Sequence, residues 1–111
     1  MGDDKFFLIV AEGIDNTQRE LIQHLIKAEA DDWWHELLDV WIVRGGLSAS
    51  NWRARLSVFV PAAPSGIMVF GLPTLPAERE IAFRMPKGSA RTKWLYEVYK
   101  GSKVPSGRAA D

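Results

Sequence analysis

A short, wholly apolar run near the start of the chain restricts its possible folds most strongly. The run is Phe6–Val10, rich in aromatic and β-branched residues and followed by Glu12 and Gly13. Successive residues of a strand point to opposite faces, so a run that is apolar at every position predicts a strand with two apolar faces. We therefore expect residues 6–10 to form a central, buried strand of a sheet.

The next residues predict an amphipathic helix over about 16–29. Asp15 stands three positions before Gln18, the spacing of a capping box at a helix start. Apolar residues then recur at helical spacing at Leu21, Ile22, Leu25 and Ile26. This spacing gives the helix one apolar side, with charged and polar residues on the other.

Residues 31–44 fit two different structures. Their apolar residues have helical spacing, but a helix here would extend the previous one beyond about 25 residues without a break. The alternative is a β-hairpin, with strands over 32–37 and 39–44 around a tight turn near Leu38 and Asp39. We favour the hairpin, which Gly45 and Gly46 would end.

The middle of the chain predicts a second helix and another strand. Ser48 is a suitable N-cap for a helix over about 49–59, although residues 57–60 also have strand-like composition. Prolines and a glycine predict a loop over 61–66, and the apolar run Ile67–Phe70 predicts a strand.

The remaining residues predict an extension from about residue 73. Its expected elements are an edge strand over Glu80–Met85 and a short helix over Thr92–Lys100, with a flexible tail over 101–111. The helix carries an apolar stripe formed by Trp94, Leu95, Val98 and Tyr99.

The order of expected elements predicts an α+β, ferredoxin-like βαββαβ fold. Residues 1–100 would form one domain, with a four-stranded antiparallel sheet, two helices on one face and the C-terminal strand and helix extension. The other face must then be polar, covered by the extension, or buried in a partner. Because strand residues alternate between faces, Trp33, Trp34 and Trp41 cannot all face the helices, and we predict that they form a partner interface.

Composition and charge exclude several classes of protein. Of the 111 residues, 47% are hydrophobic, which excludes a disordered chain. The chain has no cysteine, which excludes a disulfide framework and a thiolate metal site. The longest apolar run has only six residues, and Asp3 and Asp4 stand where a signal peptide needs positive charge, so we expect a cytoplasmic protein without a membrane segment. Net charge is zero, but residues 1–43 carry −7 and residues 44–111 carry +7.

Several motifs together resemble a known family. They are Phe6–Val10, Trp33–Leu37 with Trp41–Val43, Leu47–Ala49, Ile67–Phe70 and Trp94–Leu95. Over about residues 5–71 the chain is similar to small stand-alone bacterial and phage proteins that resemble the CRISPR-associated adaptation nucleases. This resemblance implies a ferredoxin-like homodimer that associates with DNA or RNA.

The resemblance also implies a metal site. In the nuclease-type members, an acidic residue at the end of the first strand pairs with that of a second subunit, where the carboxylates can hold Mg²⁺ or Mn²⁺. The matching residue here is Glu12, where the nuclease motif has aspartate after an aromatic residue. Glu12 is thus the candidate metal ligand and catalytic residue, while nearby Asp15 is better explained as a helix cap.

Other candidates come from the residues themselves. His35 is a candidate proton-transfer residue, although a hydrogen-bonded structural histidine is the simpler interpretation. A phosphate-contacting surface would be built from cations of the second part of the chain, which are Arg44, Arg53, Arg55, Arg84, Lys87, Arg91 and Lys93. The alternative is that these cations pair with acidic residues of the first part.

Three functional hypotheses follow from the sequence. The first is a dimeric, nucleic-acid-associated protein whose metal-dependent nuclease activity at Glu12 is retained or lost. The second is a non-enzymatic protein-interaction module that uses the open sheet face and the tryptophan-rich hairpin. The third is a metal-independent ribonuclease that uses His35.

Overall fold

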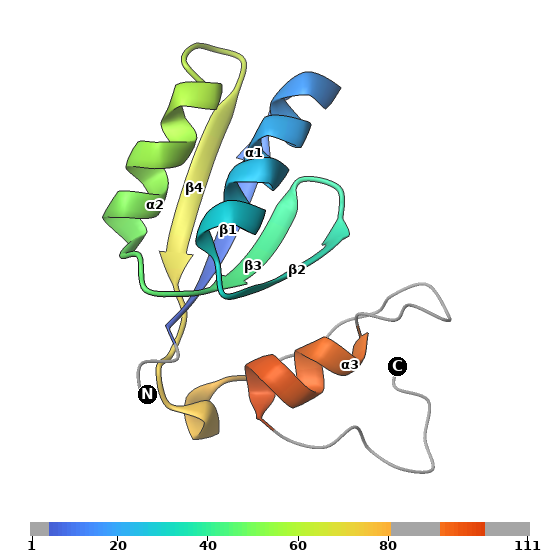
Figure 1. The fold of residues 1–111 in the computed structure, drawn as a ribbon, viewed down its shortest axis with the longest axis vertical. Coiled ribbons are helices and arrows are strands. Elements are labelled where there is room, and N and C mark those ends of the chain that lie inside the picture. Colours follow the sequence, from blue (N-terminus) through green and yellow to red (C-terminus); the bar gives the residue numbers. More distant parts are fainter. Residues whose placement is uncertain (1–4, 81–91, 102–111) are drawn as a thin grey trace.

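The structure is an α+β arrangement of one sheet and several helices (Figure 1). It is a computed structural model, and it describes residues 5–80 and 92–101. The elements are β1 (Phe6–Glu12), α1 (Asn16–Glu29), β2 (Asp32–Leu37), β3 (Val40–Arg44), α2 (Ala49–Leu56), the 3₁₀ turn η1 (Ser57–Phe59), β4 (Gly66–Gly71), the 3₁₀ turn η2 (Pro76–Glu78), α3 (Thr92–Trp94) and the π-helical turn η3 (Leu95–Lys100).

The four strands form one antiparallel sheet in the order β2-β3-β1-β4. β1 lies in the interior of the sheet, as its two apolar faces predict, and pairs with β3 on one side and β4 on the other. Ile9, at its centre, stands between Trp41 of β3 and Val69 of β4. β2 and β4 are therefore the two edge strands.

Local sequence signals set the bounds of α1 and of the hairpin that follows. The Asp15 side chain accepts a hydrogen bond from the Gln18 amide at 2.8 Å, and the Gln18 side chain accepts one from the Asp15 amide at 2.8 Å, which completes the predicted capping box. After Glu29 the backbone becomes extended at Ala30, and the Asp31 amide donates to the Arg44 carbonyl at 2.8 Å. The helix thus ends before the tryptophans, and the hairpin prediction is confirmed.

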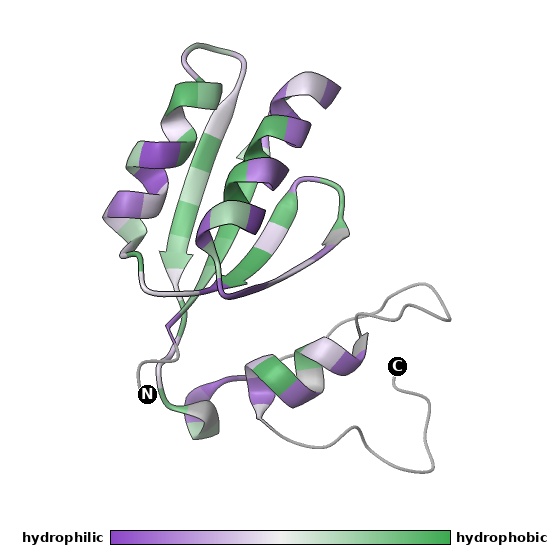
Figure 2. Cartoon of the chain, in the orientation of Figure 1, coloured by the Kyte–Doolittle hydropathy of each residue, from purple (hydrophilic) through white to green (hydrophobic). Residues whose placement is uncertain are grey.

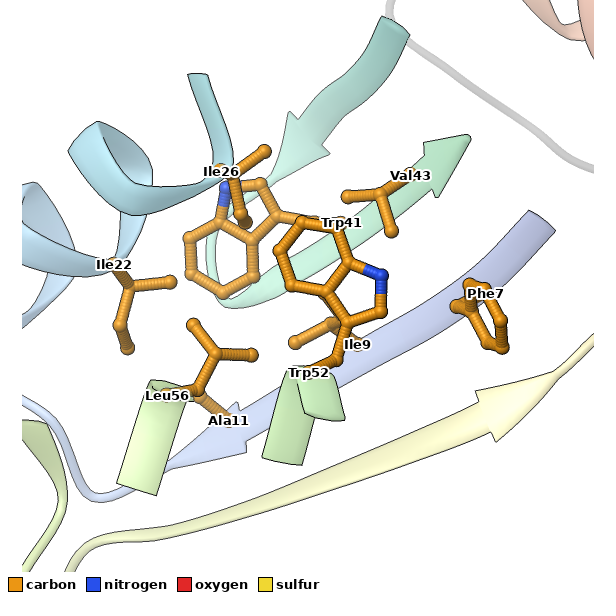
Figure 3. Packing of buried hydrophobic residues seen from close by; sticks show 9 residues of the cluster. All are labelled: Phe7, Ile9, Ala11, Ile22, Ile26, Trp41, Val43, Trp52 and Leu56. Atoms are coloured by element: carbon orange, nitrogen blue, oxygen red, sulfur yellow. The ribbon is translucent and has the colours of Figure 1, made fainter. Parts of the chain in front are cut away.

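Helices α1 and α2 cover the same face of the sheet (Figure 1). The core between these helices and the sheet contains side chains from β1, β3, α1 and α2 (Figure 3), namely Phe7, Ile9, Ala11, Ile22, Ile26, Trp41, Val43, Trp52 and Leu56. Figure 2 shows hydrophobic strands beside helices that carry both polar and apolar residues. Of the apolar side predicted for residues 16–29, Ile22 and Ile26 are buried against the sheet and Leu25 packs beside them, whereas Leu21 is exposed.

In the part of the chain that the structure describes, the opposite face is covered at one end only. Residues 92–100, which we call the C-terminal segment, pack there against Phe6 and Trp34 through Trp94, Leu95 and Tyr99. Figure 1 places this segment near the start of β1, away from the loop between α2 and β4. The predicted apolar stripe of the last helix is thus confirmed as a contact with the sheet.

Some predictions change or remain untested. The second helix ends at Leu56, and residues 57–59 form a 3₁₀ turn rather than the last turn of an α-helix or a strand. The predicted edge strand from Glu80 and the predicted tail fall on residues 81–91 and 102–111, outside the described residues. No helix in the described ranges is both long and apolar enough to cross a membrane.

Candidate interaction surface

The tryptophans of the hairpin point to both faces of the sheet, and two of them are wholly inside the chain. Trp41 is fully buried between the sheet and α1, and its indole N–H donates to the Gln23 side chain at 2.6 Å. Trp34 is buried on the other face beneath the C-terminal segment. Trp33 is half-buried on the helix face, below Lys27. The predicted partner interface of Trp33, Trp34 and Trp41 is therefore wrong for Trp34 and Trp41, because the chain covers both itself.

His35 has a structural environment. Its ring stacks on that of Trp41 at a centroid distance of 4.5 Å, and its Nε2 lies 2.9 Å from the Leu38 carbonyl oxygen in the hairpin turn. A ring nitrogen held by a turn carbonyl fixes the orientation of the imidazole. This arrangement favours the structural interpretation of His35 over a catalytic one.

Glu12 is exposed at the end of β1, opposite Gly66 of β4. By strand alternation its side chain belongs to the face that carries Leu8 and Val10, opposite to the helices. Within residues 5–80 and 92–101, no three His, Cys, Asp or Glu side chains gather closely enough to hold a metal ion. Asp15 is the helix cap, as its spacing predicts.

The candidate phosphate contacts divide into three groups. Arg44 lies 3.9 Å from Asp32, and Arg55 lies 2.9 Å from Glu29, so both are paired with acidic residues of the first part of the chain. Arg53 and Lys93 are exposed on α2 and α3. Arg84, Lys87 and Arg91 lie outside the described residues. The alternative interpretation of the cations is thus correct for two of the seven.

The most distinctive surface is an apolar part of the sheet that the C-terminal segment leaves uncovered. We call it the open face; it consists of Leu8, Val10, Val40, Met68 and Phe70. Leu8 stands opposite Phe70, and Val10 stands between Val40 and Met68, so the five side chains are contiguous across three strands. None of them belongs to either core cluster, and Met68 and Phe70 are 57% and 45% exposed. Contiguous apolar surfaces of this kind mark interaction sites.

One buried residue with a central structural role was not predicted. Arg79 is 1% exposed and donates to the carbonyl oxygens of Pro73, Thr74 and Tyr99, each at 2.8 Å. Its guanidinium also lies 4.4 Å from the centre of the Phe6 ring. The sequence predicted only the start of an extension at about residue 73, and no periodic signal distinguishes this arginine from the exposed ones. Arg79 connects the end of the sheet to the C-terminal segment.

Comparison of the chain with protein-family models, curated proteins and solved structures found no match.

Proposed function

We propose that this chain is a protein-interaction module with a ferredoxin-like fold, and that it pairs with a second copy of itself through the open face. The observation that carries the proposal is the open face itself, in which five neighbouring positions are all apolar and two are about half exposed. The fold assignment is supported by the element order and by the strand order β2-β3-β1-β4. Burial of this apolar surface would drive the association.

The C-terminal segment favours one orientation of the second copy. The segment packs on Phe6 and Trp34, on the same side of the sheet as the open face and near the start of β1. If both copies ran β1 in the same direction, their two segments would lie against each other. If one copy is reversed, each segment instead lies beside the Glu12 end of the other sheet. Exposed Lys93 of one copy then lies at the same end of the interface as exposed Glu12 of the other, and these opposite charges favour the reversed stack.

The reversed stack also bears on the metal site implied by the family resemblance. It puts the Glu12 carboxylates of the two copies at opposite ends of the interface. A paired-carboxylate centre for Mg²⁺ or Mn²⁺ would require them at one end. We therefore favour an interaction role for Glu12 over a metal-dependent nuclease role.

A second candidate function is association with nucleic acid, which the family resemblance implies. The observation that favours it is the exposure of Arg53 and Lys93, because neither side chain has an ion-pair partner among the described residues. In the reversed homodimer, where Lys93 lies beside Glu12 of the other copy, the two Arg53 side chains would remain available to phosphate.

The dimer is tested by measuring molar mass over a concentration series with light scattering. Phe70→Glu adds a charge to the open face, so we expect the dimer dissociation constant to rise by on the order of tenfold or more. Leu21→Glu is the matched control, because Leu21 is 42% exposed on α1, away from the open face. A wild-type chain that stays monomeric, or equal weakening by both variants, would contradict the proposal.

The orientation is tested by a charge exchange between Glu12 and Lys93. Glu12→Lys alone and Lys93→Glu alone each place like charges together and should weaken the dimer. The double variant restores opposite charges and should recover most of the wild-type dissociation constant. Additive weakening in the double variant would refute the reversed stack and leave the open face as the interface in another orientation.

A further inference from the structure

The outer edge of β4 lacks the usual protection of an edge strand. Among residues 5–80 and 92–101, β4 pairs only with β1, and this pairing runs without a register shift from Gly66 to Gly71. Its sequence, Gly-Ile-Met-Val-Phe-Gly, contains no charged residue and no proline. Edge strands that remain unpaired usually carry a lysine, a proline or a bulge that prevents the addition of another strand. The β4 edge is therefore competent to accept one.

A groove follows this edge. It has a volume of about 360 Å³ and lies between β4 and the neighbouring helix α2. Its lining residues are Ala49, Ser50, Arg53, Ile67, Met68 and Val69. The helix wall is low because Ala49 and Ser50 have small side chains. A groove between an edge strand and a helix suits an extended peptide, which adds to the sheet by backbone hydrogen bonds and places alternate side chains in the groove.

The charge of the groove indicates which peptides fit. Arg53 is exposed and has no ion-pair partner among the described residues, while Arg55 on the same helix is paired with Glu29 at 2.9 Å. The other lining side chains are apolar or small. A bound peptide would therefore gain from a carboxylate next to Arg53 and from β-branched residues next to β4.

We propose that the β4 edge binds an extended, acidic peptide segment of a partner protein as a fifth strand of the sheet. The peptide lies in the groove between β4 and α2, with a carboxylate against Arg53. This site uses the edge of the sheet and one side of α2, whereas the homodimer uses the open face; among the residues that line the groove, only Met68 belongs to both surfaces.

The test begins with selection of linear peptides from a random phage-displayed library on the wild-type protein. We expect selected peptides to contain Asp or Glu among β-branched residues and to slow hydrogen exchange of amides within Gly66–Gly71. Ser50→Trp fills the groove and should weaken binding of a selected peptide by on the order of tenfold or more. Asn51→Trp is the matched control, because Asn51 is exposed on the same helix and does not line the groove.

Charge reversal tests the role of Arg53. Arg53→Glu should weaken the binding of the selected acidic peptides. Selection on the Arg53→Glu protein should instead yield peptides with Lys or Arg. Equal binding by wild type and Ser50→Trp, or failure to select any peptide that protects Gly66–Gly71, would overturn the proposal. Slower hydrogen exchange within Gly66–Gly71 at higher protein concentration, in the absence of peptide, would also overturn it. The strand that pairs with β4 would then belong to a second copy of the chain. Ser50→Trp should leave the molar mass unchanged, so failure of this proposal is separable from failure of the open-face dimer.

Discussion

At the scale of single residues, Arg79 is the clearest determinant of how the C-terminal segment is held. Its guanidinium donates to three backbone carbonyl oxygens, one of which belongs to Tyr99 in that segment. A planar group with several donors in fixed directions suits such a site, and a lysine ammonium does not reproduce it. Sequence periodicity cannot reveal this role, because the carbonyl partners carry no side-chain signal.

Replacement of Arg79 by leucine should therefore destabilise the chain. Arg79→Leu removes the donor to the buried Tyr99 carbonyl oxygen and the donors to the partly buried Pro73 and Thr74 carbonyl oxygens, and we expect the free energy of unfolding to fall by about 2–3 kcal/mol. Arg79→Lys should recover only part of that loss. Urea unfolding followed by tryptophan fluorescence measures both. Unchanged stability of Arg79→Leu would show that the carbonyl contacts contribute little.

At the scale of elements, the helices and strands that contact each other through regular apolar patterns were predictable. The capping box defined the start of α1, and the length limit on a continuous helix favoured the hairpin over 32–44. The burial of Trp34 was not predictable in the same way. Alternation indicates that it faces away from Trp33 and Trp41, but its burial depends on a segment about sixty residues later in the chain.

The C-terminal segment should be sensitive to high pH through Tyr99. Burial raises the pKa of Tyr99, and the positive charge of Arg79 opposes this rise. A pKa that is higher in the folded than in the unfolded chain means that packing favours the protonated phenol. Its stabilising contribution is complete below the unfolded pKa of about 10 and is lost as pH rises through the folded pKa.

We therefore expect wild-type stability to fall more steeply than that of Tyr99→Phe as pH increases above about 10. Phenylalanine keeps the ring that packs edge-on against Phe6, at a centroid distance of 5.2 Å, and removes the titrating group. Urea unfolding of both proteins at matched pH values measures the difference, and lysine titration affects both alike. Parallel pH profiles would contradict the assigned role of Tyr99.

At the scale of the whole molecule, some of the charged side chains of the acidic first part and the basic second part form ion pairs, and others are exposed. Arg19 of α1 and Asp39 of the hairpin turn form an ion pair at 2.6 Å within the acidic first part, and Arg55 reaches Glu29 across the two parts. The sequence predicted these cations and anions but not which of them meet, because pairing depends on the tertiary contacts of α1 and α2. The sequence predicted that the helices leave one face of the sheet uncovered. It did not predict how much of that face the C-terminal segment covers.

This charge arrangement predicts a weak and strongly salt-dependent association with nucleic acid. With Arg44 and Arg55 already paired, Arg53 and Lys93 are the exposed candidates among the described residues. Each neutralised phosphate contributes on the order of 0.9 to the slope of log affinity against log salt. Fluorescence anisotropy of a labelled DNA duplex should therefore detect binding at low salt that declines as salt increases.

Arg53→Glu should weaken that binding more than Arg55→Glu, because reversal at Arg53 removes an exposed cation whereas Arg55 is already neutralised by Glu29. Equal effects of the two variants would argue against Arg53 as the main phosphate contact. Binding that is independent of salt would argue that phosphate contacts play no part and would leave association with proteins as the function of this chain.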